Sequence, residues 1–238
     1  DDPMNRFLRV IALILCVVLP LCSCDLFSLS GEKIDESAFD FETQLSPPQP
    51  GEEIAVVTTT EGVIKMKFFP QYAPQAVENF KQLAADGFYN DTYVFCVQPD
   101  MAFMAGSPAQ DGSVYKSIFN DGKPFDVEYS DAIWHFSGSV SALSDQKNKA
   151  DSRFFMLGNY KTDEDTLKKM ERSGYPEALI EKYRTVGGAP ALDRRYTVFA
   201  QAYEGLEVID AINAAEIDAE TGIPKKEIKI VSVEITKA

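Results

Sequence analysis

The strongest constraint on the fold of this chain comes from segments with the residue pattern of β-strands. They lie near the two ends of the stretch from residue 54 to residue 236. Residues 54–60 are rich in β-branched side chains, and residues 63–69 alternate apolar side chains with lysine. Residues 226–236 alternate in the same way. A period of two is typical of strands that bury one face, so the pattern predicts a mainly β domain with these segments in its sheet.

A helix is predicted directly after the second strand. Pro74 suits its first turn, where the missing N–H group leaves no hydrogen bond unmade. Gly87 is a suitable stop at its carboxyl end. The apolar residues at helical spacing between these two limits are Ala76, Val77, Phe80, Leu83 and Ala84.

The segment from Gly87 to Gly106 reads GFYNDTYVFCVQPDMAFMAG. It resembles the central active-site segment of the cyclophilins, the barrel-shaped prolyl isomerases, whose pattern is roughly G-Y-Y-D-G-T-x-F-H-R-V-x-P-G-F-M-x-Q-G-G. Identical or related residues stand at Gly87, Phe88, Tyr89, Asn90, Thr92, Val97, Pro99 and Gly106. The family's catalytic arginine falls on Cys96.

Further motifs of the same family follow in the family's order, so the resemblance covers residues 54–236. It implies a mainly β fold, namely a closed eight-stranded antiparallel β-barrel capped by two α-helices. The matching stretches are Lys116–Phe119, Lys123–Asp126, Gly138–Leu143, Ser152–Met156, Leu192–Phe199 and Glu204–Ile209.

Residues 161–190 form an insertion relative to a compact cyclophilin. Acidic residues after Asp163 favour a helix start, Gly174-Tyr175-Pro176 interrupts the helix, and a second short helix is expected from Glu177. The insertion immediately precedes the predicted strand that carries Leu192 and Tyr196. It either shapes one wall of the site or is a surface elaboration without a role in binding.

The resemblance also implies a site for rotating X–Pro bonds. That rotation breaks amide resonance, with a barrier of about 20 kcal/mol, and needs an apolar pocket with a hydrogen-bond donor rather than a nucleophile. Phe155 and Leu192 match pocket residues of the family. Tyr196 stands where the family has histidine or tyrosine. The other positions of the site carry different side chains here: Met101, Ala102, Met104, Leu143 and Ser144.

Two residues decide how the missing arginine is interpreted. Arg153 stands where the family has glutamine, two residues before Phe155 on one strand, so its guanidinium is a candidate surrogate donor. Alternatively, Arg153 anchors peptide carbonyls or pairs with Asp145 or Asp151. Cys96 is expected to be a small apolar residue rather than a reactive thiol, and no disulfide is expected within the domain.

The composition limits which metal sites and partners are expected. The chain has one histidine, His135, which excludes a multi-histidine metal site and is expected to be a packed residue. No cofactor or metal is implied by the sequence. The net charge of −14 argues against nucleic acid as a partner, and we expect a monomer that binds proline-containing segments of exported proteins.

The amino-terminal part indicates export. Asp1-Asp2-Pro3 precede Met4 and are treated as an added remnant; an apolar stretch then ends at Leu21-Cys22-Ser23-Cys24, which is similar to a bacterial lipobox. Residues 1–23 are therefore predicted to be this remnant plus a signal peptide. Cys24 is the predicted lipid-modified residue, which would anchor the protein outside the cytoplasmic membrane. Residues 24–53 are predicted to be an acidic, proline-containing tether before the domain at 54–238.

Two functions from different classes fit this sequence. The first is a peptidyl-prolyl cis-trans isomerase acting on exported or cell-surface proteins. The second is a non-catalytic module that binds proline-containing peptides, which the cysteine at position 96 favours.

Overall fold

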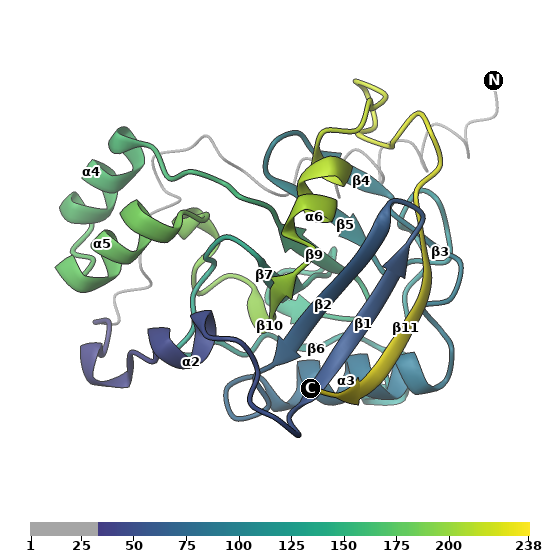
Figure 1. Cartoon of the computed structure of the whole chain (residues 1–238), viewed down its shortest axis with the longest axis horizontal. Helices are drawn as coiled ribbons and strands as arrows, with labels where there is room; N and C mark the ends of the chain where they lie inside the picture. Colours follow the sequence, from purple (N-terminus) through teal and green to yellow (C-terminus); the bar gives the residue numbers. More distant parts are fainter. Residues whose placement is uncertain (1–32) are drawn as a thin grey trace.

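The computed structural model describes residues 33–238, so the predictions for the remnant, the signal peptide and Cys24 lie outside the described residues. Within this range the chain forms a curled antiparallel sheet with helices around it (Figure 1). The predicted mainly β fold is confirmed. The main sheet has nine strands in the described residues, where the family resemblance implied eight.

The main sheet has the order β3-β11-β1-β2-β10-β7-β9-β5-β4, and β6 pairs with β8 in a separate two-stranded sheet. The strands agree with the alternating segments of the sequence. They are β1 (Glu53–Thr59), β2 (Gly62–Phe68), β3 (Thr92–Tyr93), β4 (Cys96–Gln98), β5 (Ala102–Ala105), β6 (Phe125–Asp126), β7 (Ser139–Ala142), β8 (Lys149–Ala150), β9 (Phe154–Leu157), β10 (Thr197–Glu204) and β11 (Lys229–Lys237).

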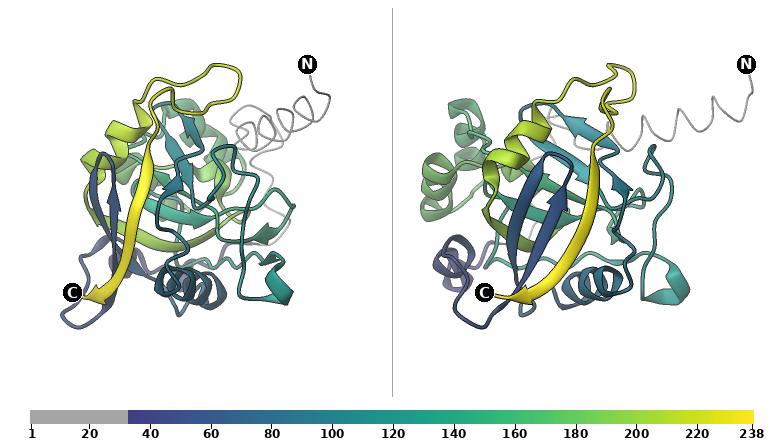
Figure 2. Two further views of the ribbon diagram at one scale, coloured as in Figure 1. Left: turned by 90° about the vertical axis from the view of Figure 1, so that its right-hand side faces the viewer. Right: turned by 45° about the vertical axis from the view of Figure 1, so that its right-hand side comes forward.

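The sheet curls so that its two outer strands belong to one stretch of chain. β3 pairs with β11, and β4, only two residues later, pairs with β5. Tyr93 of β3 also bridges Ser107, just beyond β5. Figure 2 shows β11 running beside the β1–β2 hairpin while the other strands curve behind it. This curvature encloses a large apolar core and leaves the outer faces of several strands available for other contacts.

Two helices flank the curled sheet, as expected. α3 (Pro74–Ala85) begins at the predicted proline and packs on β10 and β11, while α6 (Leu206–Asn213) packs on β2 and β5. Gly87 follows α3 with φ of 70°, a left-handed conformation that glycine adopts without strain. The short 3-10 segments are η1 (Glu36–Ala38), η2 (Asn120–Gly122) and η3 (Pro190–Leu192).

The insertion forms the two helices that the sequence predicted, α4 (Glu164–Arg172) and α5 (Glu177–Val186). The side chain of Asp163 caps α4 by accepting a hydrogen bond of 2.8 Å from the backbone N–H of Thr166. The helices lie beside the sheet rather than on its core (Figure 1). Their apolar faces meet Trp134 and Phe136 in a separate cluster, so the insertion has a small core of its own.

The end of the predicted tether packs on the insertion. Phe39 and the helix α2 (Phe41–Leu45) contact the cluster beneath α4 and α5, and Ile34 is 3% exposed within it. Gln44 is fully buried, donating to the Trp134 carbonyl at 2.7 Å and accepting from the Trp134 N–H at 2.9 Å. Of the helices in residues 33–238, none combines the length and apolar composition needed to cross a membrane.

Candidate active site

A second apolar cluster lies on the face of the sheet opposite to the main core. Strand side chains alternate between faces, so Phe154 enters the main core and Phe155 the second cluster. Cys96 pairs with Met104, and Met104 pairs with Phe155, across β4, β5 and β9. Directly paired residues share a face, so these three side chains lie side by side.

This second cluster, called the site cluster below, collects most of the residues predicted for the proline site. Each of its predicted members is at most 1% exposed, and Tyr196 packs at its edge. Ser144 follows directly after Leu143 and is 5% exposed. The predicted members are Cys96, Met101, Ala102, Met104, Leu143, Phe155 and Leu192.

The rim of the site cluster is aromatic. Tyr93, Tyr160 and Tyr196 are partly exposed and pack against it. The ring of Tyr196 meets that of Phe155 edge-on, with centroids 5.3 Å apart and an angle of 87°. Burial raises the pKa of Tyr196 to about 12, so its hydroxyl stays protonated at neutral pH.

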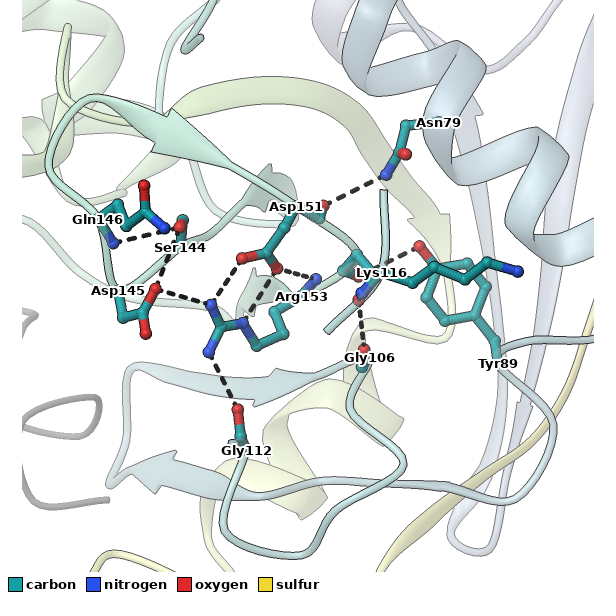
Figure 3. A network of polar contacts seen from close by, with 11 residues as sticks. Asn79, Tyr89, Gly106, Gly112, Lys116, Ser144, Asp145, Gln146, Asp151 and Arg153 are labelled. Carbon is teal, nitrogen blue, oxygen red and sulfur yellow. Dashed lines mark hydrogen bonds and ion pairs between the residues drawn. The ribbon is translucent and has the colours of Figure 1, made fainter. Parts of the chain in front are cut away.

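Arg153 does not project freely toward the site cluster. Its side chain is fully buried, with Nε 3.0 Å and Nη2 2.6 Å from the two carboxylate oxygens of Asp151. Nη2 also lies 3.2 Å from Asp145, and Nη1 donates to the carbonyl of Gly112 at 3.0 Å. Figure 3 shows the guanidinium enclosed by these groups, and its remaining face lies 4.8 Å from the ring of Tyr115.

The geometry therefore favours the second interpretation of Arg153, pairing with Asp145 and Asp151. Burial lowers the pKa of Arg153, but its hydrogen bonds and attraction to the two carboxylates more than offset this, and the net pKa is raised. Four of the five N–H groups of the guanidinium have partners. Arg153 thus ties the loop at Gly112 to the strand that carries Phe155.

Cys96 is 1% exposed in the site cluster, as a small apolar residue would be. Cys96 is the only cysteine of residues 33–238. We assign its sulfur no nucleophilic role.

One polar group beside the site cluster was missed by sequence reasoning. His135 is buried, as expected, and its ring lies nearly parallel to that of Phe155, with centroids 6.1 Å apart. Its Nδ1 is 2.9 Å from Asp193, the residue after Leu192. The Leu-Asp pair was read only as a family motif, and nothing in the sequence connected Asp193 with a histidine 58 positions away.

Across residues 33–238, histidine, cysteine and carboxylate side chains form no group of three that could hold a metal ion. The site cluster itself is lined by apolar and aromatic side chains, which are poor ligands for a hard cation.

Fold and site together define a cyclophilin-like sheet with an apolar cluster on its outer face. The family model of cyclophilin-type peptidyl-prolyl cis-trans isomerases matches residues 54–235. The chain therefore belongs to the cyclophilin-type peptidyl-prolyl cis-trans isomerase family, as the resemblance predicted.

Two bacterial relatives show how far this similarity extends. A Staphylococcus saprophyticus protein assigned as a peptidyl-prolyl cis-trans isomerase is 31% identical over 195 residues, covering 82% of this chain and 98% of its own length. A Streptococcus pyogenes protein assigned as a bifunctional phosphatase and peptidyl-prolyl cis-trans isomerase is 32% identical over 181 residues. That match covers 75% of this chain, which spans only 38% of the streptococcal protein.

Solved structures agree on the fold. A cyclophilin-type isomerase of Cryptosporidium parvum, crystallised in the presence of the dipeptide Ala-Pro, superimposes with a TM-score of 0.61 at 22% identity. The match covers 78% of this chain and 99% of that one. At this identity the likeness supports the fold alone.

Proposed function

We propose that this protein accelerates cis-trans isomerisation of X–Pro bonds in exported or cell-surface proteins, and that the site cluster receives the proline ring. The observation that carries the proposal is the gathering of Phe155, Leu192 and Met101 in one apolar cluster with a tyrosine rim. Family membership and the Ala-Pro dipeptide present with the Cryptosporidium relative also support it.

The chemistry would depend on a dry site rather than on an arginine at position 96. A planar amide is stabilised by resonance that separates charge, and twisting the bond removes that stabilisation. An apolar environment solvates the planar form poorly, so it favours the twisted form relative to water. The side chains of the cluster are covered, so a proline ring would enter between the partly exposed tyrosines of the rim, among them Tyr196.

The isomerase proposal predicts faster folding of a protein whose refolding is limited by proline isomerisation. That phase takes about 10–100 s at 25 °C without a catalyst. Residues 25–238, added at a tenth of the substrate concentration or less, are expected to shorten it at least twofold. A phase that shortens only at stoichiometric protein, or not at all, would contradict catalysis.

The second candidate function is a proline-peptide-binding module without catalysis. It is favoured by the engagement of Arg153 with Asp151 and Asp145, which leaves the family's guanidinium position without a substitute from this residue. In that case, peptides would bind and the refolding phase would keep its uncatalysed rate.

We also propose that the protein is a lipoprotein, anchored through Cys24 outside the cytoplasmic membrane. The apolar stretch and the Leu-Cys-Ser-Cys sequence at 21–24 support this proposal. Full-length protein expressed in a bacterium is expected to sediment with membranes, and Cys24→Ala to abolish lipid attachment as measured by mass spectrometry. An unmodified Cys24 in the membrane-bound wild-type protein would contradict the proposal.

A further inference from the structure

The carboxylate of Asp193 joins the insertion to the wall of the site cluster. Asp193 accepts hydrogen bonds of 2.8 Å from the Tyr183 hydroxyl at both of its oxygens. One of these oxygens also lies 2.9 Å from His135 Nδ1 and accepts from the His135 backbone N–H at 3.2 Å. The side chains of His135 and Asp193 are at most 2% exposed, so these bonds form away from water and are sensitive to loss of a partner.

Tyr183 is protonated, so its hydroxyl can donate to Asp193. Burial raises the pKa of Tyr183 well above its usual value, with the nearby Asp193 adding to the effect. The hydroxyl therefore stays a donor over the accessible pH range. With Tyr183 donating to Asp193, His135 can present Nδ1–H to the same carboxylate, which would fix its tautomer and ring plane.

The ring of His135 lies next to that of Phe155. The two rings lie 6.1 Å apart with planes only 11° from parallel. The backbone holds the same segment, since Ala189 N–H donates to the His135 carbonyl at 2.8 Å. Gly188 approaches so closely that a Cβ there would lie 2.2 Å from that carbonyl oxygen, so this contact requires glycine.

Tyr183 is itself held by the core of the insertion. Its ring is fully buried and lies 4.8 Å from that of Phe136, among apolar residues of α4 and α5. The hydroxyl therefore projects from a packed helix rather than from a mobile loop. A group fixed in this way can orient a neighbour with little loss of conformational entropy.

We propose that Tyr183 is a positioning residue of the proline site: through Asp193 it orients His135 against Phe155, so the insertion at 161–190 braces one wall of the site. This inference rests on the proposed function and assigns the insertion a role in it. Asp193 also follows Leu192 directly in the chain, so the hydrogen bonds of its carboxylate would help to hold Leu192, a second predicted pocket residue, in position.

The test replaces Tyr183 with phenylalanine, which removes one hydroxyl and keeps the ring. His135 is the only histidine of the chain, so its imidazole NMR signals need no further assignment. Tyr183→Phe is expected to shift these signals without added peptide. It should also weaken binding of a short Ala-Pro-containing peptide about tenfold, in line with the loss of one supporting hydrogen bond.

The matched control is Tyr72→Phe. Tyr72 also donates to an aspartate, Asp40, at 2.8 Å, but neither residue belongs to the site cluster. This control is expected to keep wild-type affinity and unshifted imidazole signals. If Tyr183→Phe is not folded by circular dichroism, Asp193→Asn is measured in its place with the same expectation.

Equal peptide affinity in the wild type and in Tyr183→Phe would overturn the inference and leave the proposed function intact. Unshifted imidazole signals in Tyr183→Phe would overturn it as well, because the hydroxyl would then not orient His135. If the wild-type protein itself does not bind the peptide, the proposed function fails and the inference fails with it.

Discussion

Asp151→Ala is expected to lower the free energy of unfolding by about 3–5 kcal/mol. The Asp151–Arg153 pair is fully buried, with an Nη2–Oδ2 distance of 2.6 Å. Removing the carboxylate leaves a guanidinium inside the protein with Asp145, at 3.2 Å, as its remaining anionic partner. The cost arises from this stranded charge rather than from the lost attraction alone, because water cannot reach the group to solvate it.

Denaturant unfolding measures the effect, and Asp126→Ala is the control. Asp126 pairs with Lys149 at 2.7 Å, but its side chain is 81% exposed, so a change of at most about 1 kcal/mol is expected. A double variant, Asp151→Leu with Arg153→Met, should lose less stability than Asp151→Ala, since it strands no charge. Equal losses for Asp151→Ala and Asp126→Ala would show that Arg153 is solvated or paired in another way.

Phe155→Ala is expected to weaken binding of an X–Pro peptide at least tenfold. The ring is fully buried in the site cluster and contacts the rings of Tyr196 and His135, so its removal takes away one apolar wall of the proposed proline site. The substitution also leaves a cavity, with a stability loss of about 3–5 kcal/mol. Affinity must therefore be measured well below the unfolding temperature of the variant.

Phe154→Ala separates loss of affinity from loss of stability. Phe154 is the preceding residue of the same strand but faces the main core, where it meets Phe80 and Tyr89. We expect a similar stability loss with peptide affinity close to that of the wild type, as titration calorimetry would show. If both variants lost affinity equally, the site cluster would not be the proline site.

The fold was predictable because local signals and the family motifs agreed. Alternation at 54–69 and 226–236 predicted the strands that became β1, β2 and β11, and Pro74 began the predicted helix. The two helices of the insertion also followed from Asp163 and the Gly-Tyr-Pro break. Each of these signals depends on a few neighbouring residues. Strand propensity and helix capping are local effects of this kind, so they can be read from the sequence.

The sequence alone could not decide which contacts Arg153 makes. Its place two residues before Phe155 suggested a shared face, yet its side chain turns to Asp151 and to the Gly112 carbonyl. The contact with Gly112 spans 41 positions and depends on how the loop after β5 folds back. Tyr183 and Asp193 were missed for the same reason, because their hydrogen bonds join a helix of the insertion to the segment just after η3, and the contact with His135 spans 58 positions.

Exchange spectroscopy on a short X–Pro peptide separates an isomerase from a binding module, because NMR follows the cis and trans forms while the protein is present in catalytic amount. We expect residues 25–238 to accelerate exchange in proportion to their concentration, and we expect Phe155→Ala to lose most of this acceleration while Phe154→Ala retains it. Peptide signals that shift on binding while exchange keeps its uncatalysed rate would contradict the proposed isomerase activity and identify a proline-binding module instead.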